Sequence, residues 1–289
     1  MSPISRRDFV RMSAAAAAAS TITAKLTAAE LKAPLGLQLY SVRTLLPNDF
    51  DGTLAKIAQA GFKHVEAAGY YNKTAAEWRK AVDAAGLRCT STHHPLGLLK
   101  QHEDEFIDFA HTAGLDYLIC SSPIKKDPAA KGPMTLDDWK WVSGEFNRIG
   151  EKVKAAGLRF GYHNHIHEFD QENGTIFYDE LLRSTDPKLV VLELDCGWVS
   201  AAGRDPVTYL SKTPERFPLL HVKDMVKQAD GSSHSVVLGK GYIDYHHILK
   251  AATGLKQYFV EQEEFTANTP ATILDELNQD AAYMRSFRL

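Results

Sequence analysis

Acidic and imidazole side chains close six of the short apolar runs in this sequence. The positions concerned are Glu66, His93, His163, Asp195, His221 and Glu261. Carboxylates and imidazoles held close together repel one another or must share protons unless a cation binds between them. A divalent metal ion takes both oxygen and nitrogen ligands of this kind. The pattern therefore indicates a metal site, provided that the fold brings these six ends together.

The apolar runs alternate with amphipathic helical segments. Eight runs are predicted strands, at residues 35–40, 63–66, 87–92, 117–120, 159–163, 189–195, 219–223 and 257–261. Helix starts are predicted at Asp49, Thr74 and Thr135, whose side chains can accept hydrogen bonds from free helical amides. Helix ends are predicted before Gly61, Gly86, Gly114, Gly157 and Gly254, because glycine tolerates the positive φ common after a helix.

Eight strand–helix units predict an α/β fold, a single (β/α)8 TIM barrel. An open, doubly wound sheet is the alternative, but no Gly-x-Gly-x-x-Gly motif follows a predicted strand. The nearest approach, Gly239-Lys240-Gly241, is expected in a loop that turns before the next helix. In barrels of this kind the reactive groups lie at the carboxyl ends of the strands, where the six side chains above are found.

The composition argues against nucleic-acid binding and against a disulfide-stabilised fold. The chain has 289 residues and a formal charge of −3, which provides no basic surface for nucleic-acid phosphates. Its three cysteines, Cys89, Cys120 and Cys196, are widely spaced and are expected to be buried core residues rather than a disulfide framework.

Residues 1–29 are predicted to form an export signal, and residues 30–289 are predicted to form the barrel. Arg6-Arg7, Phe9 and the alanine run from Ala14 to Ala19 follow the order of a twin-arginine signal. The run is too short to span a bilayer. We therefore expect export by the twin-arginine machinery, and a periplasmic or otherwise exported mature protein without a membrane span.

Several short motifs together resemble one family. They are residues 36–41 (GLQLYS), 163–165 (HNH), 194–195 (LD), 221–224 (HVKD), 238–244 (LGKGYID) and 260–262 (VEQ). In this order they resemble the xylose isomerase-like barrel superfamily, often called sugar phosphate isomerases/epimerases, from Leu35 to the C-terminus. The resemblance implies one divalent metal ion bound by His163, Asp195, His221 and Glu261.

Two positions depart from the family pattern. His163 stands where the family has a glutamate before Asn-His, and Trp198 stands where related sequences often have a histidine. The ligand from the fifth predicted strand therefore stays open between His163, His165 and Glu168.

The remaining roles follow from this placement. Glu261 is expected to move a proton, helped by His163 or His165. Glu66, His93, Asn164 and Lys223 are expected to contact the substrate, and Glu193 to be structural. Simpler interpretations remain: Asp195 and Glu261 as acids facing helix N-termini, His163 and His221 as core histidines, and Lys223-Asp224 as a surface ion pair.

The function expected from these observations is a metal-dependent isomerase, epimerase or lyase that acts on a sugar or ketosugar through an enediolate. The mixed ligand set favours manganese, cobalt, iron or zinc over magnesium. Export favours an oxidised glycoside, a ketosugar or a cyclitol over a phosphosugar. A non-catalytic sugar-binding barrel is the alternative, and a three-metal nuclease of the same fold is disfavoured by the acidic charge and by Trp198. The oligomeric state is open, a homo-oligomer included.

Overall fold

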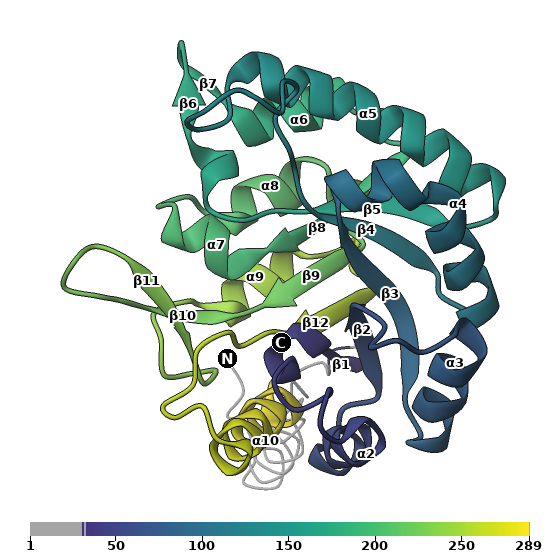
Figure 1. The fold of residues 1–289 in the computed structure, drawn as a ribbon. Helices are drawn as coiled ribbons and strands as arrows, with labels where there is room; N and C mark the ends of the chain where they lie inside the picture. Colours follow the sequence, from purple (N-terminus) through teal and green to yellow (C-terminus); the bar gives the residue numbers. More distant parts are fainter. Residues whose placement is uncertain (1–30, 32, 289) are drawn as a thin grey trace, which may run out of the picture. The chain divides into compact units, whose positions relative to one another are not determined.

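Eight parallel strands close into a barrel in the computed structural model, which describes Leu31 and residues 33–288 (Figure 1). In chain order the strands are β1 (Leu35–Gln38), β2 (His64–Ala68), β3 (Arg88–Pro95), β4 (Tyr117–Ser122), β5 (Arg159–His163), β8 (Val190–Asp195), β9 (Leu219–Val222) and β12 (Gln257–Val260). Strand β1 pairs with both β2 and β12, so the sheet has no free edge. This closure confirms the predicted barrel and excludes the open sheet. The predicted export signal at residues 1–29 lies outside the described residues.

Helices follow the strands and lie around the outside of the barrel (Figure 1). They are α2 (Phe50–Ala60), α3 (Ala75–Ala84), α4 (Leu96–Ala113), α5 (Leu136–Ala155), α6 (Phe177–Ser184), α7 (Cys196–Ala201), α8 (Pro206–Lys212), α9 (Tyr245–Ala251) and α10 (Pro270–Ser286), with the short 3-10 turns η1 (Leu39–Val42), η2 (His167–Phe169) and η3 (Pro214–Arg216). Two hairpins extend the loops: β6 (Gln171–Glu172) with β7 (Thr175–Ile176), and β10 (Asp224–Lys227) with β11 (Ser233–Val236).

The predicted helix starts are confirmed. Asp49 accepts a hydrogen bond from the Gly52 amide, and Thr74 and Thr135 both form capping boxes. The loop after Gly239 ends as predicted, with Asp244 capping α9. Such reciprocal hydrogen bonds satisfy amides that the helix cannot pair internally. The helix boundaries are therefore specified by residues within one turn of each start.

Four of the five predicted glycine positions have positive φ, and Gly254 does not. Helix α9 does end before Gly254, but the expected positive φ is wrong there, because a different constraint requires glycine. A β-carbon at Gly254 would lie 1.9 Å from the Pro214 carbonyl oxygen, so the backbone of η3 leaves no room for a side chain.

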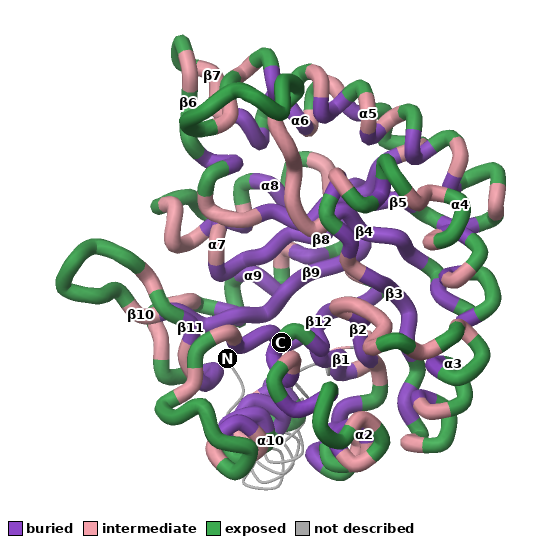
Figure 2. The backbone as a smooth tube through the Cα atoms, viewed as in Figure 1, coloured by how far each residue is buried: buried purple, intermediate pink, exposed green. Residues whose placement is uncertain are grey.

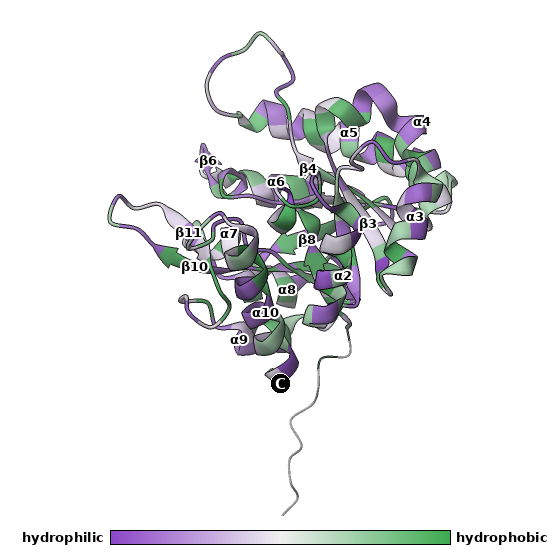
Figure 3. Cartoon of the chain, turned by 60° about the horizontal axis from the view of Figure 1, so that its bottom comes forward, coloured by the Kyte–Doolittle hydropathy of each residue, from purple (hydrophilic) through white to green (hydrophobic). Residues whose placement is uncertain are grey.

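The strands are buried over most of their length, whereas the outer faces of the helices are exposed (Figure 2). Hydropathy follows the same division: β8 is hydrophobic, and the outer helices alternate hydrophobic and hydrophilic residues (Figure 3). Tyr117, Ile119, Val191, Leu219 and Phe259 form a separate apolar cluster. Because side chains alternate along a strand, Val191, Leu219 and Phe259 share a face with Glu193, His221 and Glu261, respectively. An apolar layer inside the barrel therefore underlies a polar one.

The three cysteines are free and buried, as predicted. Within the described part of the chain, no helix has the length and apolar character needed to cross a membrane.

Candidate metal centre

The polar layer of the barrel is built by strand ends that are neighbours in the sheet. His163 is in register with Glu193 across β5 and β8, and Asp195 is in register with His221 across β8 and β9. Glu261 follows β12 directly, and its amide donates to the Val222 carbonyl on β9. Four strands thus direct these five side chains to one end of the barrel, as the sequence pattern predicts.

His163, Asp195, His221 and Glu261 come together as one set. Their ligand atoms all lie within 4.8 Å of one another, and none of the four residues is more than 6% exposed. Asp195 Oδ2 has an ionic contact with Lys223 but accepts no hydrogen bond from any described residue. Two imidazoles and two carboxylates, one with an unsatisfied oxygen, suit a divalent transition metal ion of intermediate softness. We call these four residues the upper set.

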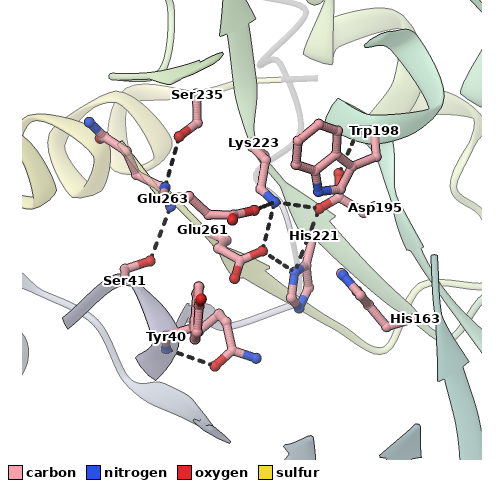
Figure 4. A network of polar contacts seen from close by, with 12 residues as sticks. Tyr40, Ser41, His163, Asp195, Trp198, His221, Lys223, Ser235, Glu261 and Glu263 are labelled. Atoms are coloured by element: carbon pink, nitrogen blue, oxygen red, sulfur yellow. Dashed lines mark hydrogen bonds and ion pairs between the residues drawn. The ribbon is translucent and has the colours of Figure 1, made fainter. Parts of the chain in front are cut away.

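A buried ammonium lies against the upper set. Lys223 is fully buried, and its Nζ lies 3.0 Å from Asp195 Oδ2, 2.9 Å from Glu261 Oε2 and 2.5 Å from Glu263 Oε1 (Figure 4). Although burial opposes the charge, Asp195 and Glu261 raise the pKa of Lys223 well above its ordinary value. The alternative interpretation of Lys223-Asp224 as a surface ion pair is therefore wrong. The Asp224 carboxylate instead accepts backbone hydrogen bonds from the loop around Gly239 and Gly241.

The backbone around Lys223 is fixed by neighbouring elements. Its amide donates to Tyr245 Oη at 2.6 Å, and the Tyr245 hydroxyl donates to its carbonyl at 2.8 Å. Ser235 of the β10–β11 hairpin accepts a hydrogen bond from the Glu263 amide at 2.8 Å. The ammonium and its outermost carboxylate are thus positioned by α9 and by the hairpin.

A second group of titratable side chains lies beside the upper set. His93, His163, Glu193 and His221 also have ligand atoms within 4.8 Å of one another, and we call them the deeper set. Glu193 Oε2 lies 2.7 Å from His93 Nε2, 3.3 Å from His163 Nδ1 and 3.2 Å from His221 Nε2. Glu66 Oε2 adjoins it, 3.0 Å from His93 Nε2 and 2.7 Å from His221 Nε2. Glu193, which is predicted to be structural, contacts three of the candidate residues through its carboxylate.

Burial and close charges shift the titration of these groups in opposite directions. Burial opposes protonation of His221, but Glu193 and Glu261 raise its pKa well above 6.5. Burial and the neighbouring His221 instead lower the pKa of His163 well below 6.5. In His93, burial is outweighed by Glu66 and Glu193, which raise the pKa to about 9. Adjacent imidazoles that differ in this way provide both cationic and neutral nitrogen groups in one site.

Among the three strand-five candidates, only His163 belongs to either set. The His165 ring lies 4.8 Å from that of His163 and 6.2 Å from that of Trp198, and burial followed by Lys223 lowers its pKa to about 4. Glu168 is buried and accepts a hydrogen bond from the Tyr162 hydroxyl. The geometry therefore favours His163 over His165 and Glu168 as the strand-five ligand.

The Asn164 side chain hydrogen-bonds to the backbone of Asp195, a member of the upper set. Its Oδ1 accepts a hydrogen bond from the Asp195 amide at 3.0 Å, and its Nδ2 donates to the Asp195 carbonyl at 3.4 Å. Both ends of this side chain therefore hold the backbone of a candidate ligand. The substrate contact expected from Asn164 stays a prediction, and the structure adds a positioning contact.

Glu263 was missed by sequence reasoning. The spacing of the two glutamates could have indicated it. Glu263 follows Glu261 by two residues, and residues two apart at a strand end face the same side. The same spacing relates Glu193 to Asp195.

Comparison with known proteins places the chain among proteins of the same architecture. Residues 54–287 match the family described as Xylose isomerase-like TIM barrel. An inosose dehydratase from Clostridium beijerinckii is 28% identical over 193 residues, which cover 62% of this chain and 64% of that enzyme. The chain thus spans less than two thirds of the length of this curated relative.

Solved structures extend the likeness over most of the chain. A sugar phosphate isomerase/epimerase from Parabacteroides distasonis is 30% identical with a TM-score of 0.69, covering 91% of this chain and 97% of that one. The IOLI protein with a bound zinc atom has a TM-score of 0.65, covering 87% of this chain and 96% of that one, and at 14% identity it shows the fold alone.

Proposed function

Because the chain belongs to the xylose isomerase-like TIM barrel family, we propose that it is a metal-dependent carbohydrate enzyme that removes the proton beside a carbonyl group. The observation that carries the proposal is the upper set with the buried Lys223 ammonium against it. The inosose dehydratase relatives favour elimination of water from a polyhydroxylated ketone as the outcome. Isomerisation of a ketosugar begins with the same proton removal and is the second candidate.

His163, Asp195, His221 and Glu261 would hold the divalent ion. When bound, such an ion supplies Lewis acidity that polarises a carbonyl and its neighbouring hydroxyl. Zinc, manganese, iron and cobalt suit two imidazoles and two carboxylates better than magnesium does.

Glu261 is the proposed base. Burial disfavours its charge, but Lys223 and His221 lower its pKa well below the ordinary value, so it is ionised at neutral pH and can accept a proton. The Lys223 ammonium would also donate a hydrogen bond to an oxygen that gains negative charge beside it.

Glu263 is the proposed acid. Its side chain is 22% exposed, shares the Lys223 ammonium, and has a pKa raised by burial against the opposing effect of Lys223. A carboxyl group of this kind can protonate a leaving hydroxyl. Elimination then balances: the carbon-bound proton passes to Glu261, and the hydroxyl departs with the Glu263 proton as water.

Export is part of the proposal. Arg6-Arg7 and the alanine run support a twin-arginine precursor, which would place the mature enzyme outside the cytoplasm. That location favours an unphosphorylated ketosugar, a 3-ketoglycoside or a cyclic ketone as the substrate.

The test uses residues 30–289, loaded separately with manganese, cobalt and zinc. Turnover is followed on a panel of inososes, ketosugars and 3-ketoglycosides by loss of substrate and by the ultraviolet absorbance of an unsaturated ketone product. We expect Glu261→Gln to abolish turnover while metal stays bound, and Asp195→Asn to lose the upper ion. Glu105→Gln, an exposed carboxylate on α4, is the matched control and should leave turnover unchanged.

Two results would contradict the proposal. Full turnover in Glu261→Gln would remove it as the base. Saturable sugar binding without turnover, in a protein that takes up no metal, would favour a sugar-binding barrel instead.

A further inference from the structure

The deeper set has the composition of a metal site in its own right. His93, His163 and His221 present three imidazole nitrogens to one oxygen, Glu193 Oε2, at 2.7, 3.3 and 3.2 Å, respectively. The four residues come from β3, β5, β8 and β9, so separate strands fix their positions. Three imidazoles and one carboxylate suit a transition metal ion.

Two buried atoms of this set lack hydrogen bonds. Among the described residues, none donates to Glu193 Oε1, and His163 Nδ1 makes no hydrogen bond although it lies 3.3 Å from Glu193 Oε2. His163 and Glu193 are 2% and 0% exposed, respectively. Buried polar atoms are almost always paired, so these unsatisfied atoms call for a partner that protein groups do not provide.

The two sets differ in how their negative charge is balanced. Asp195 and Glu261 of the upper set contact the Lys223 ammonium. In the described part of the chain, Glu66 and Glu193 have ionic contacts with histidines alone, and no lysine or arginine lies within ion-pair distance of either carboxylate. A divalent ion bound by these same imidazoles would neutralise the charge of the two buried carboxylates.

The two sets share His163 and His221, and the two nitrogens of His221 face different members of them. Its Nδ1 lies 3.0 Å from Glu261 Oε2 on the upper side, and its Nε2 lies 2.7 Å from Glu66 Oε2 and 3.2 Å from Glu193 Oε2 on the deeper side. A single ring therefore directs one nitrogen to each set.

We infer that the deeper set, His93, His163, Glu193 and His221, binds a second divalent transition metal ion beside the upper one. Glu66 hydrogen-bonds at the edge of this set and is itself held by Gln38 Nε2 at 2.8 Å and Ser91 Oγ at 2.5 Å. With both ions bound, His221 would offer one nitrogen to each ion, and both of its ring protons would leave to solvent. The inference does not depend on which reaction the barrel catalyses.

The experiment measures metal content with manganese as the probe. Residues 30–289 are stripped with a chelator, reloaded with MnCl2, desalted and analysed by elemental analysis and by electron paramagnetic resonance. We expect two ions per chain in the wild type, with a signal broadened by spin coupling across the imidazole. His93→Gln and Glu193→Gln should each retain one ion with an uncoupled six-line signal. Asp195→Asn should also fall from two ions to one.

Controls separate this inference from the proposed function. His102→Gln, at a histidine of α4 whose side chain is 42% exposed, should keep both ions. Thermal melting should show that each variant is folded. If either His93→Gln or Glu193→Gln fails to fold, the other variant provides the test.

Each remaining outcome decides the question. One ion in the wild type, kept in His93→Gln and lost in Asp195→Asn, overturns the deeper site and leaves the proposed function standing. One ion kept in Asp195→Asn and lost in His93→Gln supports the deeper site and removes the metal placement of the proposed function. A wild type without metal overturns both.

Discussion

Replacing Lys223 with methionine tests whether the buried ammonium holds the upper set together. Lys223 is fully buried, and its Nζ lies within 3.0 Å of carboxylate oxygens of Asp195, Glu261 and Glu263. Methionine fills a similar volume without the charge. The substitution therefore leaves three neighbouring carboxylates without their cation in the metal-free protein.

The expected cost follows from the burial of these groups. Removing one partner of a buried ion pair costs about 3–5 kcal/mol, because an uncompensated charge stays in a medium of low polarity. For a chain of this size, that loss lowers the melting temperature by roughly 10 °C.

The pH dependence has a defined sign. The raised pKa of Lys223 contributes stability below its ordinary value of 10.5, and this is lost as the pH rises through the folded pKa. The lowered pKa of Glu261 contributes stability above its ordinary value of 4.5, lost as the pH falls through the folded pKa. Without the ammonium the three carboxylates bind protons more readily. The deficit of Lys223→Met should therefore be smaller at pH 5 than at pH 8.

The assay is urea unfolding in the presence of a chelator at both pH values. Lys100→Met is the matched control, since Lys100 contacts Glu145 at the surface with its side chain 32% exposed, and should cost less than about 1 kcal/mol. A free energy of unfolding for Lys223→Met within about 1 kcal/mol of the wild type, or a deficit that does not shrink at pH 5, would refute the reasoning.

Three further predictions concern the scaffold and the ligand support. Gly254→Ala should lower the free energy of unfolding in urea by about 1–3 kcal/mol, because its β-carbon would meet the Pro214 carbonyl. Gly144→Ala, in α5 with open space around it, should be neutral or stabilising. Equal effects of the two substitutions would contradict the steric argument. Burial raises the pKa of Asp280 from 3.8 to about 7, so its ionised form lowers stability as the pH rises through that range. Asp280→Asn should accordingly be more stable than the wild type at pH 8 by roughly 1–3 kcal/mol and gain nothing at pH 4, and a gain that is independent of pH would count against the assignment. Asn164→Ala should weaken manganese binding about 10- to 100-fold in a calorimetric titration, because the Asp195 backbone loses its support; an unchanged Kd would remove this positioning role.

Much of the architecture could be predicted from the sequence because it depends on neighbouring residues. The strand at residues 159–163 and the helix starts after Asp49, Thr74 and Thr135 follow from apolar patterning and from caps within one turn. The glycine at position 254 shows the limit of such local rules. Its constraint comes from Pro214, which is forty residues earlier in the chain.

The upper set was also accessible to sequence reasoning, since each member stands at or just after a strand end and barrels bring those ends together. Sequence reasoning left the strand-five ligand open, and the structure favours His163 because its ring lies beside that of His221. The substrate contact expected from Asn164 stays a prediction, and only the structure shows that its amide holds the Asp195 backbone.

By itself, then, the sequence determined the alternating elements, the barrel and the end at which the chemistry collects, because periodicity and capping act over a few residues. Only the tertiary structure decided how the charges are paired. Whether Lys223 is a surface ion pair or a buried ammonium depends on three carboxylates from two other strand ends. That Glu66 and Glu193 face one nitrogen of His221 while Glu261 faces the other depends on the register around a closed sheet, which no local pattern in the chain encodes.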